Sequence, residues 1–299
     1  MKKLIKSVTR YTQTLLTENS VSESLEPVIR KNIHTAYYPS GNVRLQIIFN
    51  EREEEESRFE YIYDLNNLLI EEITHDETGS VIEKKCFERD GNGKICFEKK
   101  FYQEGEPDII TYCYDETGSL ISRETRDEED DLLEKEVFEY ENGKLVLEKK
   151  YNEKEKPILE KTITSNENER IVELNFKSPE ENYRLITSYN EKGNQEKICK
   201  YDNTGRLVER TLYFEDDNGR VIEMEEETAY LKNTTRFSYD GFGNVIMEEE
   251  INKNGLLTQR VEREYDEMGN IVTSHVFIDG HGVSANRQYT YRFVYEFYD

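Results

Sequence analysis

A turn signal recurs along this chain every 12 to 14 residues, from about residue 38 to the end, and this short period limits the fold more than any other feature. Its clearest copies read Tyr-Asp-x-x-Gly-x followed by Leu, Val or Ile, and they begin at Tyr114, Tyr201, Tyr239 and Tyr265. A fixed short period indicates that each repeat is a small structural unit that buries its apolar residues against its neighbours. The chain is therefore predicted to be a repeat array.

Glycine marks twelve of the repeats, from Gly41 to Gly282, and the average interval is 12.7 residues. A turn takes about four or five of these residues, which leaves strands of about eight. Parallel strands need crossover connections of about a dozen residues or more, and the period leaves no room for them. The array is therefore predicted to be an all-β, single-sheet antiparallel meander of about twenty short strands.

The motif has a backbone explanation, which the copy at Asp115–Gly118 illustrates. An aspartate at the first position of a type I turn can accept hydrogen bonds from N–H groups of the turn. A glycine three positions later adopts the left-handed conformation without a Cβ clash, which gives a three-residue hairpin loop with a bulge. The residues predicted to have these structural roles are Asp115, Gly118, Asp202, Gly205, Asp240, Gly243, Asp266 and Gly269.

Between the turns, aromatic and β-branched residues alternate with glutamate and lysine, as in Lys94–Tyr102 and Leu207–Phe214. Only 35% of the residues are hydrophobic, which is little for a sandwich with two buried inner faces. Sheets of more than about ten strands rarely stay open and flat, because strands twist. We therefore expect a sheet that is curled into a spiral or trough, with cross-strand ion pairs in the middle of its strands.

The first residues follow a different pattern. Apolar side chains recur at the spacing of one helix face and basic residues flank them, so a short helix is predicted over residues 2–17. With a second short helix over residues 20–31, it forms a predicted N-terminal helical cap, residues 1–35, on an array of residues 36–299. Repeat arrays need such caps on their open edges, and the alternative is a helix that docks on another protein. The apolar residues of the first helix are Leu4, Val8, Tyr11 and Leu15.

The net charge of −24, from 64 acidic against 40 basic residues, limits the expected partners. Phosphate backbones and anionic membranes would be repelled, so we expect no nucleic acid binding and favour a protein partner with a basic surface. No run of about 18 apolar residues exists, so no membrane insertion is expected. The first residues lack the apolar segment of a signal peptide, and we expect a cytoplasmic protein.

The residue types that usually carry catalysis or bind metals do not form a recognisable set. The four cysteines include no Cys-x-x-Cys pair and no nearby histidine pair, so a zinc site is not expected. None of the four histidines has a serine, cysteine or carboxylate partner at an informative spacing. The segment Glu88–Lys99 partly matches a calcium-binding loop, but Lys99 stands where such loops need a bidentate glutamate. No catalytic, cofactor-binding or metal-binding residue is therefore predicted, and no cofactor.

Two segments are candidates for contact with a partner. One is an acidic run in a predicted turn, where charge projects into solvent, although such runs are more often simply solvated. The other is the final strand, which places five aromatic residues on one face and would be either a well-packed closing strand or a free edge that binds a partner. The acidic residues are Asp127, Glu128, Glu129, Asp130 and Asp131, and the aromatic residues are Tyr289, Tyr291, Phe293, Tyr295 and Phe297.

The intact Tyr-Asp-x-x-Gly copies resemble the YD repeats of the Rhs family, and Tyr38–Val43 is similar to short hairpin repeats of the MORN-like type. Degenerate copies, such as His75–Val81, extend the likeness over about residues 38–299. The resemblance implies a spiral β-sheet strip. In large members such strips wrap into shells around secreted toxins, and some repeats are credited with carbohydrate binding. This chain differs from them in its shorter length and in having no recognisable toxin domain.

The function expected from these observations is a non-enzymatic, protein-binding repeat module, as an immunity or accessory protein of a bacterial polymorphic toxin system. Acidic complementarity would speed the capture of a basic toxin. One alternative is a carbohydrate-binding protein of the cell surface, which would use the tyrosine-rich face. Another is a structural scaffold or filament built by edge-to-edge association, with the oligomeric state left open.

Overall fold

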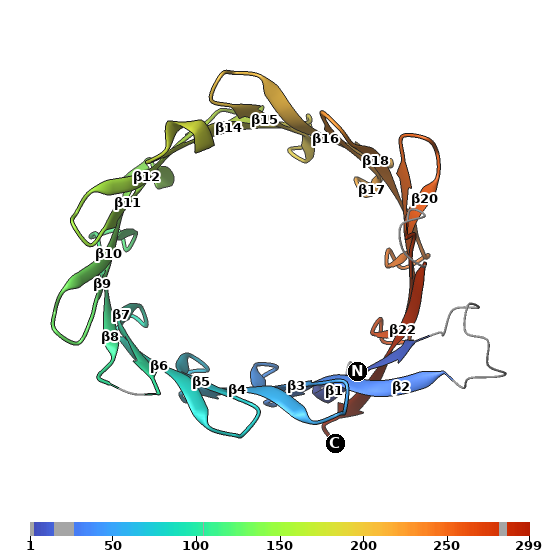
Figure 1. Ribbon diagram of the computed structural model, residues 1–299, viewed down its shortest axis with the longest axis horizontal. Coiled ribbons are helices and arrows are strands. Elements are labelled where there is room, and N and C mark those ends of the chain that lie inside the picture. Colours follow the sequence, from blue (N-terminus) through green and yellow to red (C-terminus); the bar gives the residue numbers. More distant parts are fainter. Residues whose placement is uncertain (1–2, 15–26, 104, 281–285) are drawn as a thin grey trace. The chain divides into compact units, whose positions relative to one another are not determined.

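The computed structural model describes residues 3–14, 27–103, 105–280 and 286–299. These residues form 22 strands and one short 3-10 helix, and the strands are assigned to one antiparallel sheet (Figure 1). The elements are β1 (Ile5–Thr14), β2 (Val28–Tyr37), β3 (Val43–Phe49), β4 (Glu55–Tyr63), β5 (Leu69–His75), β6 (Val81–Arg89), β7 (Ile95–Tyr102), β8 (Asp108–Tyr114), β9 (Leu120–Arg126), β10 (Leu132–Glu141), β11 (Lys144–Asn152), β12 (Pro157–Ser165), β13 (Glu169–Phe176), η1 (Pro179–Glu181), β14 (Tyr183–Tyr189), β15 (Gln195–Asp202), β16 (Leu207–Glu215), β17 (Val221–Thr228), β18 (Lys232–Tyr239), β19 (Val245–Asn252), β20 (Leu257–Tyr265), β21 (Ile271–Ile278) and β22 (Arg287–Phe297).

The chain divides into two compact units. The first unit comprises residues 1–82, 221–224 and 232–299. In it, β18 to β22 pair in sequence order, β22 pairs with β1, and β1 to β5 again follow sequence order. The second unit comprises residues 83–220 and 225–231. Its strands from β6 to β16 pair in sequence order, as a meander of hairpins requires.

The predicted N-terminal helix is wrong, because Ile5–Thr14 is strand β1. In its middle, Thr9 lies between Val294 of β22 and His34 of β2 in the strand register. Hydrogen bonds to two neighbouring strands satisfy the backbone that a helix would have satisfied internally. Of the second predicted helix, residues 20–26 lie outside the described residues, and Val28–Tyr37 is strand β2.

The predicted open spiral or trough is also wrong, because the first and last strands pair with each other. Ile5 and Phe297 are paired at one end of this ladder and Thr14 and Tyr289 at the other. Since β22 also pairs with β21 and β1 also pairs with β2, neither terminal strand has a free edge. Figure 1 shows β1 beside β22.

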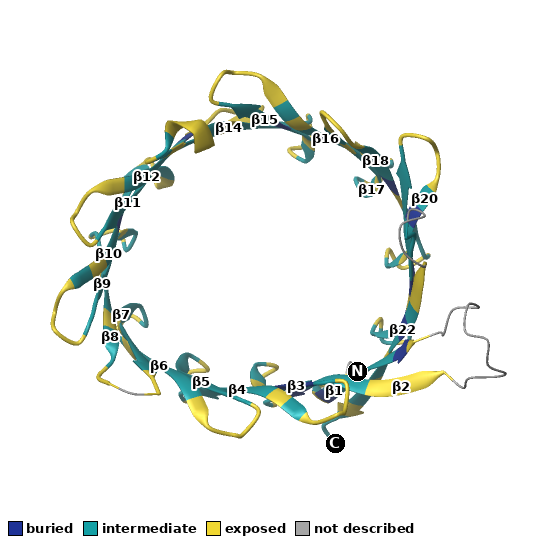
Figure 2. Ribbon diagram, in the orientation of Figure 1, coloured by how far each residue is buried: buried dark blue, intermediate teal, exposed yellow. Residues whose placement is uncertain are grey.

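The sheet has little core in the usual sense. No described side chain is fully buried, and the strands are mostly half-buried while the turns are exposed (Figure 2). In a single layer, side chains are covered by their neighbours on the same face, so cross-strand pairs provide much of the stabilisation. The buried hydrophobic residues are Ala36, Ile47, Phe49, Ile163, Val172, Cys199, Val261 and Val276.

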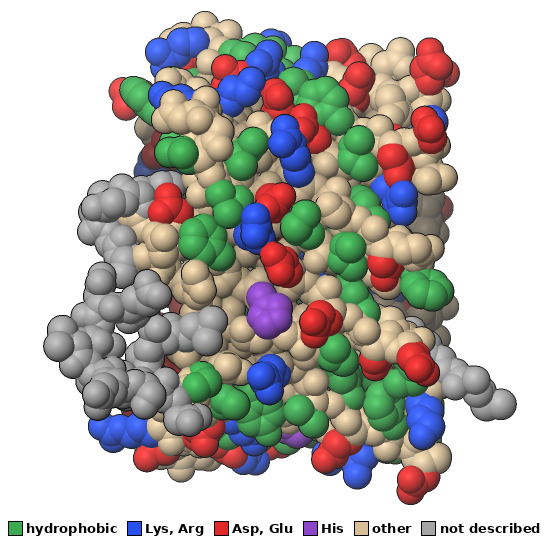
Figure 3. Space-filling view, turned by 90° about the vertical axis from the view of Figure 1, so that its right-hand side faces the viewer, with side chains coloured by type: hydrophobic (Ala, Val, Ile, Leu, Met, Phe, Trp, Pro, Cys, Tyr) green, Lys and Arg blue, Asp and Glu red, His purple; other side chains and the backbone are tan. Residues whose placement is uncertain are grey.

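The cross-strand ion pairs that the sequence predicts are present in the middle of the strands. Lys135 lies 2.6 Å from Glu124, and Arg123 lies 2.6 Å from Glu136, which is only 9% exposed. On the face displayed in Figure 3, acidic and basic side chains are interleaved with hydrophobic ones. Charge therefore takes part in the lateral packing of this sheet.

Candidate functional site

The turn at Asp115 has the geometry of a type I turn followed by a left-handed residue. The Asp115 Oδ1 accepts hydrogen bonds from the backbone N–H groups of Thr117 and Ser119, each at 2.9 Å. Gly118 donates its N–H to the Asp115 carbonyl oxygen and has a φ of +86°. Hydrogen bonds from Thr117 and Ser119 hold the pKa of the Asp115 carboxyl below its usual value, because they favour the charged form.

The other intact motif copies form the same turn. In each copy the aspartate Oδ1 accepts two backbone hydrogen bonds, from the residues two and four positions later. These interactions satisfy the backbone of the turn, which gives the motif a structural role. The aspartates are Asp202, Asp240 and Asp266, and the left-handed glycines are Gly205, Gly243 and Gly269.

The tyrosine of the motif makes a contact that the sequence does not reveal. The hydroxyl of Tyr265 in β20 donates a hydrogen bond of 2.8 Å to the carbonyl oxygen of Val245, the first residue of β19. Tyr114 donates in the same way to Ile95, the first residue of β7. Tyr239 donates likewise to the first residue of β17, so in three of the four intact copies the motif tyrosine links one turn to the start of the preceding strand. In the fourth copy, the Tyr201 ring lies 5.3 Å from the Arg184 guanidinium.

Basic residues replace the tyrosine in three degenerate repeats. Arg89 and Arg126 donate from a guanidinium nitrogen to the carbonyl oxygens of Gly93 and Asp130, at 3.0 and 2.8 Å. His75 lies with its Nδ1 3.2 Å from the corresponding carbonyl oxygen of Gly79. Each of these side chains therefore contacts the carbonyl oxygen of the left-handed residue in its own turn. A basic residue directly before a turn aspartate is the sequence signal for this variation.

The acidic turn between β9 and β10 is built like the motif turns. The Asp127 Oδ1 accepts hydrogen bonds from the N–H groups of Glu129 and Asp131, at 3.0 and 2.8 Å. Asp130 takes the place of glycine with a φ of +68°. The neighbouring turn at the same end of the strands is attached to it, because the Glu106 N–H donates to the Glu128 Oε2 at 2.9 Å.

A surface hollow of about 530 Å³ lies beside this turn, over β7, β8 and β9. Strand register places Lys99, Ile109 and Arg126 side by side in its middle. We call it the β7–β9 hollow. Its lining residues are Lys99, Phe101, Glu106, Pro107, Ile109, Thr111, Arg126, Asp127, Glu128 and Asp130.

The two basic residues of the β7–β9 hollow are already engaged. Lys99 lies 2.6 Å from Glu88, and Arg126 donates to the Asp130 carbonyl oxygen. Among the described residues, no lysine or arginine forms an ion pair with the carboxylates of Glu106, Asp127 or Glu128. The hollow therefore combines an apolar floor with three carboxylates that lack a cationic partner among the described residues, while the fourth, that of Asp130, lies 3.8 Å from the Arg126 guanidinium.

The aromatic residues predicted for partner binding form a half-buried row on one face of β22. Tyr289 and Tyr291 make an edge-to-face contact at 5.2 Å, and the Arg10 guanidinium of β1 lies 4.6 Å from the Tyr291 ring. The Tyr295 hydroxyl donates to the Ile271 carbonyl oxygen at 2.9 Å. The row thus packs against its neighbouring strands, and partner binding by it stays a prediction.

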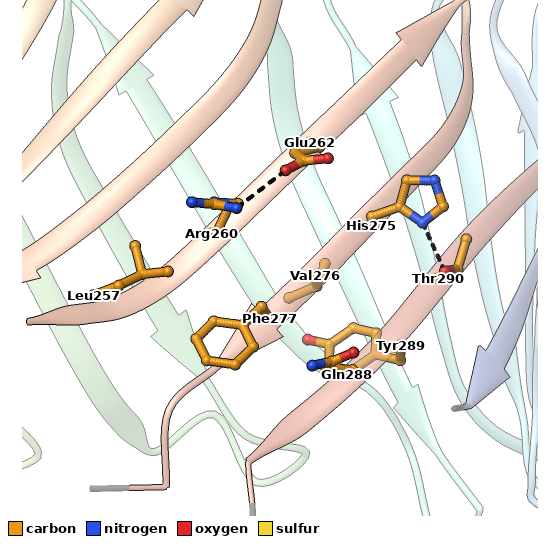
Figure 4. Close-up of a pocket in the computed structure, with 9 residues that line it drawn as sticks. All are labelled: Leu257, Arg260, Glu262, His275, Val276, Phe277, Gln288, Tyr289 and Thr290. Atoms are coloured by element: carbon orange, nitrogen blue, oxygen red, sulfur yellow. Dashed lines mark hydrogen bonds and ion pairs between the residues drawn. The ribbon is translucent and has the colours of Figure 1, made fainter. Parts of the chain in front are cut away.

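A second hollow, of about 360 Å³, lies over β20, β21 and β22 (Figure 4). The Phe277 ring is flanked by Arg260 on one neighbouring strand and Gln288 on the other. In the next row, His275 accompanies Thr290, with 2.9 Å between Nδ1 and Oγ1. We call it the β20–β22 hollow, and it offers an aromatic ring surrounded by planar polar side chains.

The sequence also predicts no site at the cysteines, the histidines or other possible metal ligands. The four cysteines are free thiols, and no group of three or more metal-ligating side chains occurs in the described part of the chain. His281 lies outside the described residues. In the same part of the chain, no helix has the length and apolar character needed to span a membrane.

Comparison with known proteins gives weak structural neighbours. No family model matches the chain. No curated protein matches it. Two neighbours are chains of TcdB2-TccC3 toxin complexes. One, from a structure with Cdc42, has 13% identity and a TM-score of 0.37 over 94% of this chain and 18% of its own length. The other, without its hypervariable C-terminal region, has 10% identity and a TM-score of 0.36 over 94% and 20%. A porin-like protein from Bacteroides uniformis has 10% identity and a TM-score of 0.34 over 99% and 98%.

Proposed function

We propose that this chain is a non-enzymatic, protein-binding repeat module that captures a partner with a basic surface. We further propose that it acts in the cytoplasm as an immunity or accessory protein of a bacterial polymorphic toxin system, as the likeness of its motif to YD repeats suggests. The observation that carries the proposal is the acidic turn Asp127–Asp131 beside the β7–β9 hollow, where the carboxylates of Asp127 and Glu128, which form no ion pair with a described lysine or arginine, border apolar surface.

The charge of the chain supports this proposal. At a net charge of −24, long-range attraction would raise the rate of encounter with a basic protein. Exposed carboxylates at turns contribute to steering and specificity more than to affinity, because salt and water screen them. The complex is therefore expected to weaken as the salt concentration rises.

The test is affinity capture from the native organism, at low and at high salt, with mass spectrometry of the bound proteins. The bait is the full chain or a variant with Glu128→Gln, Glu129→Gln and Asp131→Asn. A matched control variant, Glu51→Gln, Glu53→Gln and Glu54→Gln, removes the same charge from the turn between β3 and β4. A basic partner that is lost only with the first variant supports the proposal, and recovery of no protein at low salt would contradict it.

A second candidate function, carbohydrate binding, is favoured by the β20–β22 hollow. Sugar rings present apolar C–H faces and hydroxyl groups, and the hollow offers the Phe277 ring beside the side chains of Arg260 and Gln288. Ligand pockets commonly combine an apolar wall with a few placed polar groups in this way. The function would require export of the protein to the cell surface.

Saturation-transfer NMR with a panel of neutral monosaccharides tests this candidate. Binding that Phe277→Ala abolishes and that Phe214→Ala leaves intact would support it, since Phe214 is an exposed aromatic residue outside the hollow. Localisation of the protein wholly in the cytosol would contradict it. The third candidate, a filament, was motivated by open sheet ends, and the pairing of β1 with β22 removes that motivation.

A further inference from the structure

We infer that the β7–β9 hollow receives a single lysine or arginine side chain of the protein partner. The inference rests on the proposed function, because it names the chemical group by which the partner would be recognised. It uses two features that lie together only in the folded chain. One is an apolar floor formed by Phe101, Pro107 and Ile109, and the other is an acidic rim formed by Glu106 and Glu128.

The floor suits an aliphatic stem. Ile109 is 38% exposed at the centre of the hollow, with Phe101 and Pro107 between it and the turn that follows β7. Lysine and arginine side chains lay their methylene groups along apolar surface while the charged end remains in a polar environment. A stem on this floor would cover apolar area that the single-layer sheet leaves open to water.

The rim suits the charged end of the same side chain. The hydrogen bond from the Glu106 backbone N–H to the Glu128 Oε2 joins the two turns and fixes the Glu128 carboxylate at the border of the hollow, which Glu106 also lines. Lys99 does not neutralise either carboxylate, because its ammonium group is paired with Glu88. A cation from outside would therefore find one acceptor, Glu128, that is already positioned, with a second carboxylate, that of Glu106, beside the same hollow.

Other occupants fit less well. A neutral apolar side chain would remove water from the carboxylates of Glu106 and Glu128 without giving them a partner, which is costly. An anionic side chain would be repelled by four acidic lining residues against two basic ones. The chemistry of the hollow thus favours a long side chain with a positive end.

The experiment uses the full chain with isotope-labelled isoleucine methyl groups and follows their NMR shifts. The probe is a blocked pentapeptide of glycines with one central lysine, compared with peptides carrying norleucine or 2,3-diaminopropionate there. We expect the Ile109 methyl signal to shift saturably with the lysine peptide alone. Ile121 is equally exposed, at 38%, but lies outside the hollow, so its signal should stay in place. Equal shifts with norleucine, or no shift at Ile109, would overturn the inference.

A pair of variants tests the rim. Glu106→Gln with Glu128→Gln removes both charges and keeps an oxygen acceptor for the Glu106 N–H, and it should weaken lysine-peptide binding about fivefold. Glu129→Gln removes one charge from the same turn outside the hollow and should leave binding unchanged. Similar affinities for the double variant and the unmodified chain would show that the carboxylates of Glu106 and Glu128 do not bind the charged end of the lysine.

The two proposals fail separately. One outcome is affinity capture of a salt-sensitive basic partner that still binds the Ile109→Asn variant and the double glutamine variant. In that case the inference that the hollow receives a basic side chain is wrong, and the proposed function stands. If the lysine peptide binds at Ile109 but low-salt capture yields no protein, the inference about the hollow stands and the proposed function is wrong. Ile121→Asn is the control for the fold, because it introduces the same polar change on another part of the sheet.

Discussion

The Tyr265 hydroxyl and the Val245 carbonyl oxygen lie 2.8 Å apart, joined by a hydrogen bond between the end of β20 and the start of β19. Val245 directly follows the turn that contains Gly243, and Tyr265 directly precedes the turn that contains Gly269. Two successive turns at the same end of the strands are therefore connected through one side chain. In this copy the motif tyrosine connects neighbouring repeats in addition to packing its ring.

Replacing Tyr265 with phenylalanine should lower the free energy of unfolding by about 1 kcal/mol, because it removes the hydrogen bond and keeps the ring. Urea denaturation followed by circular dichroism measures the change. Tyr140→Phe is the control, since the structure shows no hydrogen bond from the Tyr140 hydroxyl to any described residue. Equal losses in the two variants would mean that the hydroxyl bond contributes nothing.

Two glycines in one turn should respond differently to alanine. Gly243 has a φ of +90°, which strains a residue with a Cβ, whereas Gly241 lies outside the left-handed region. Neither added Cβ would meet an atom within 4 Å. Gly243→Ala should cost about 1–2 kcal/mol of stability, and Gly241→Ala should be neutral or slightly stabilising. Thermal unfolding of both variants measures the difference, and a loss as large for Gly241→Ala would contradict the explanation.

Acid should weaken the fold through the turn aspartates. Backbone and side-chain hydrogen bonds from Arg220 lower the pKa of Asp216 from 3.8 to about 2. Because the folded pKa lies below the unfolded one, this stabilisation is present above pH 3.8 and is lost as the pH falls through about 2.

Urea midpoints measured between pH 5 and pH 2 test this expectation. Asp216→Asn should flatten the acid-side decline relative to the unmodified chain. Asp217→Asn, in the same turn but without turn hydrogen bonds to its carboxylate among the described residues, should leave the decline as it is. A decline that is the same in all three proteins would exclude Asp216 as a source of acid sensitivity.

The ion pair of the half-buried Arg123 with the buried Glu136 should matter more than an exposed one. Arg123→Leu leaves the Glu136 side chain, 11% exposed, with Lys150 at 3.8 Å as its one cation among the described residues, and should cost about 2 kcal/mol. Arg206→Leu removes a guanidinium that is 77% exposed and pairs with Asp202, and should cost less than about 0.5 kcal/mol. Calorimetric unfolding of both variants gives the comparison, and equal costs would contradict it.

Removal of β1 should make the protein associate. Deleting residues 1–14 leaves the neighbouring edges of β2 and β22 without hydrogen-bond partners, and free edges invite pairing with other chains. Size-exclusion chromatography with light scattering should show oligomers or aggregates of the shortened chain. Deleting residues 1–3, which precede the strand, should leave the oligomeric state unchanged. A shortened chain that keeps the oligomeric state of the full chain would contradict the role of β1.

The glycine period is sufficient to predict an antiparallel meander, because turn chemistry is local. It was insufficient for Ile5–Thr14, where a few apolar residues matched a helix face by chance. The β-branched residues Val8, Thr9, Thr12 and Thr14 were the opposing signal, since they favour strands. The pairing of Ile5–Thr14 with β22 joins residues about 280 positions apart, which no local period can indicate.

The acidic half of the candidate site was visible in the sequence, because Asp127–Asp131 is one continuous run. The apolar half was not, since Phe101 and Ile109 come from two earlier strands and join the turn only through strand register. Likewise, a basic residue in the tyrosine position looks like random drift until its bond to the turn is seen. Long-range register is what the sequence leaves undetermined.

The ladder between β1 and β22 also bears on the connectivity of the chain. Ile5 pairs with Phe297, and the Tyr298 N–H donates to the Leu4 carbonyl oxygen at 2.9 Å, so the first and last described strands meet end to end at Leu4 and Tyr298. A short linker could join them, and the backbone could then be cut at an exposed turn such as that of Gly243 with every described strand pair retained. The sheet therefore suits circular permutation, with a new start in an exposed turn between two paired strands.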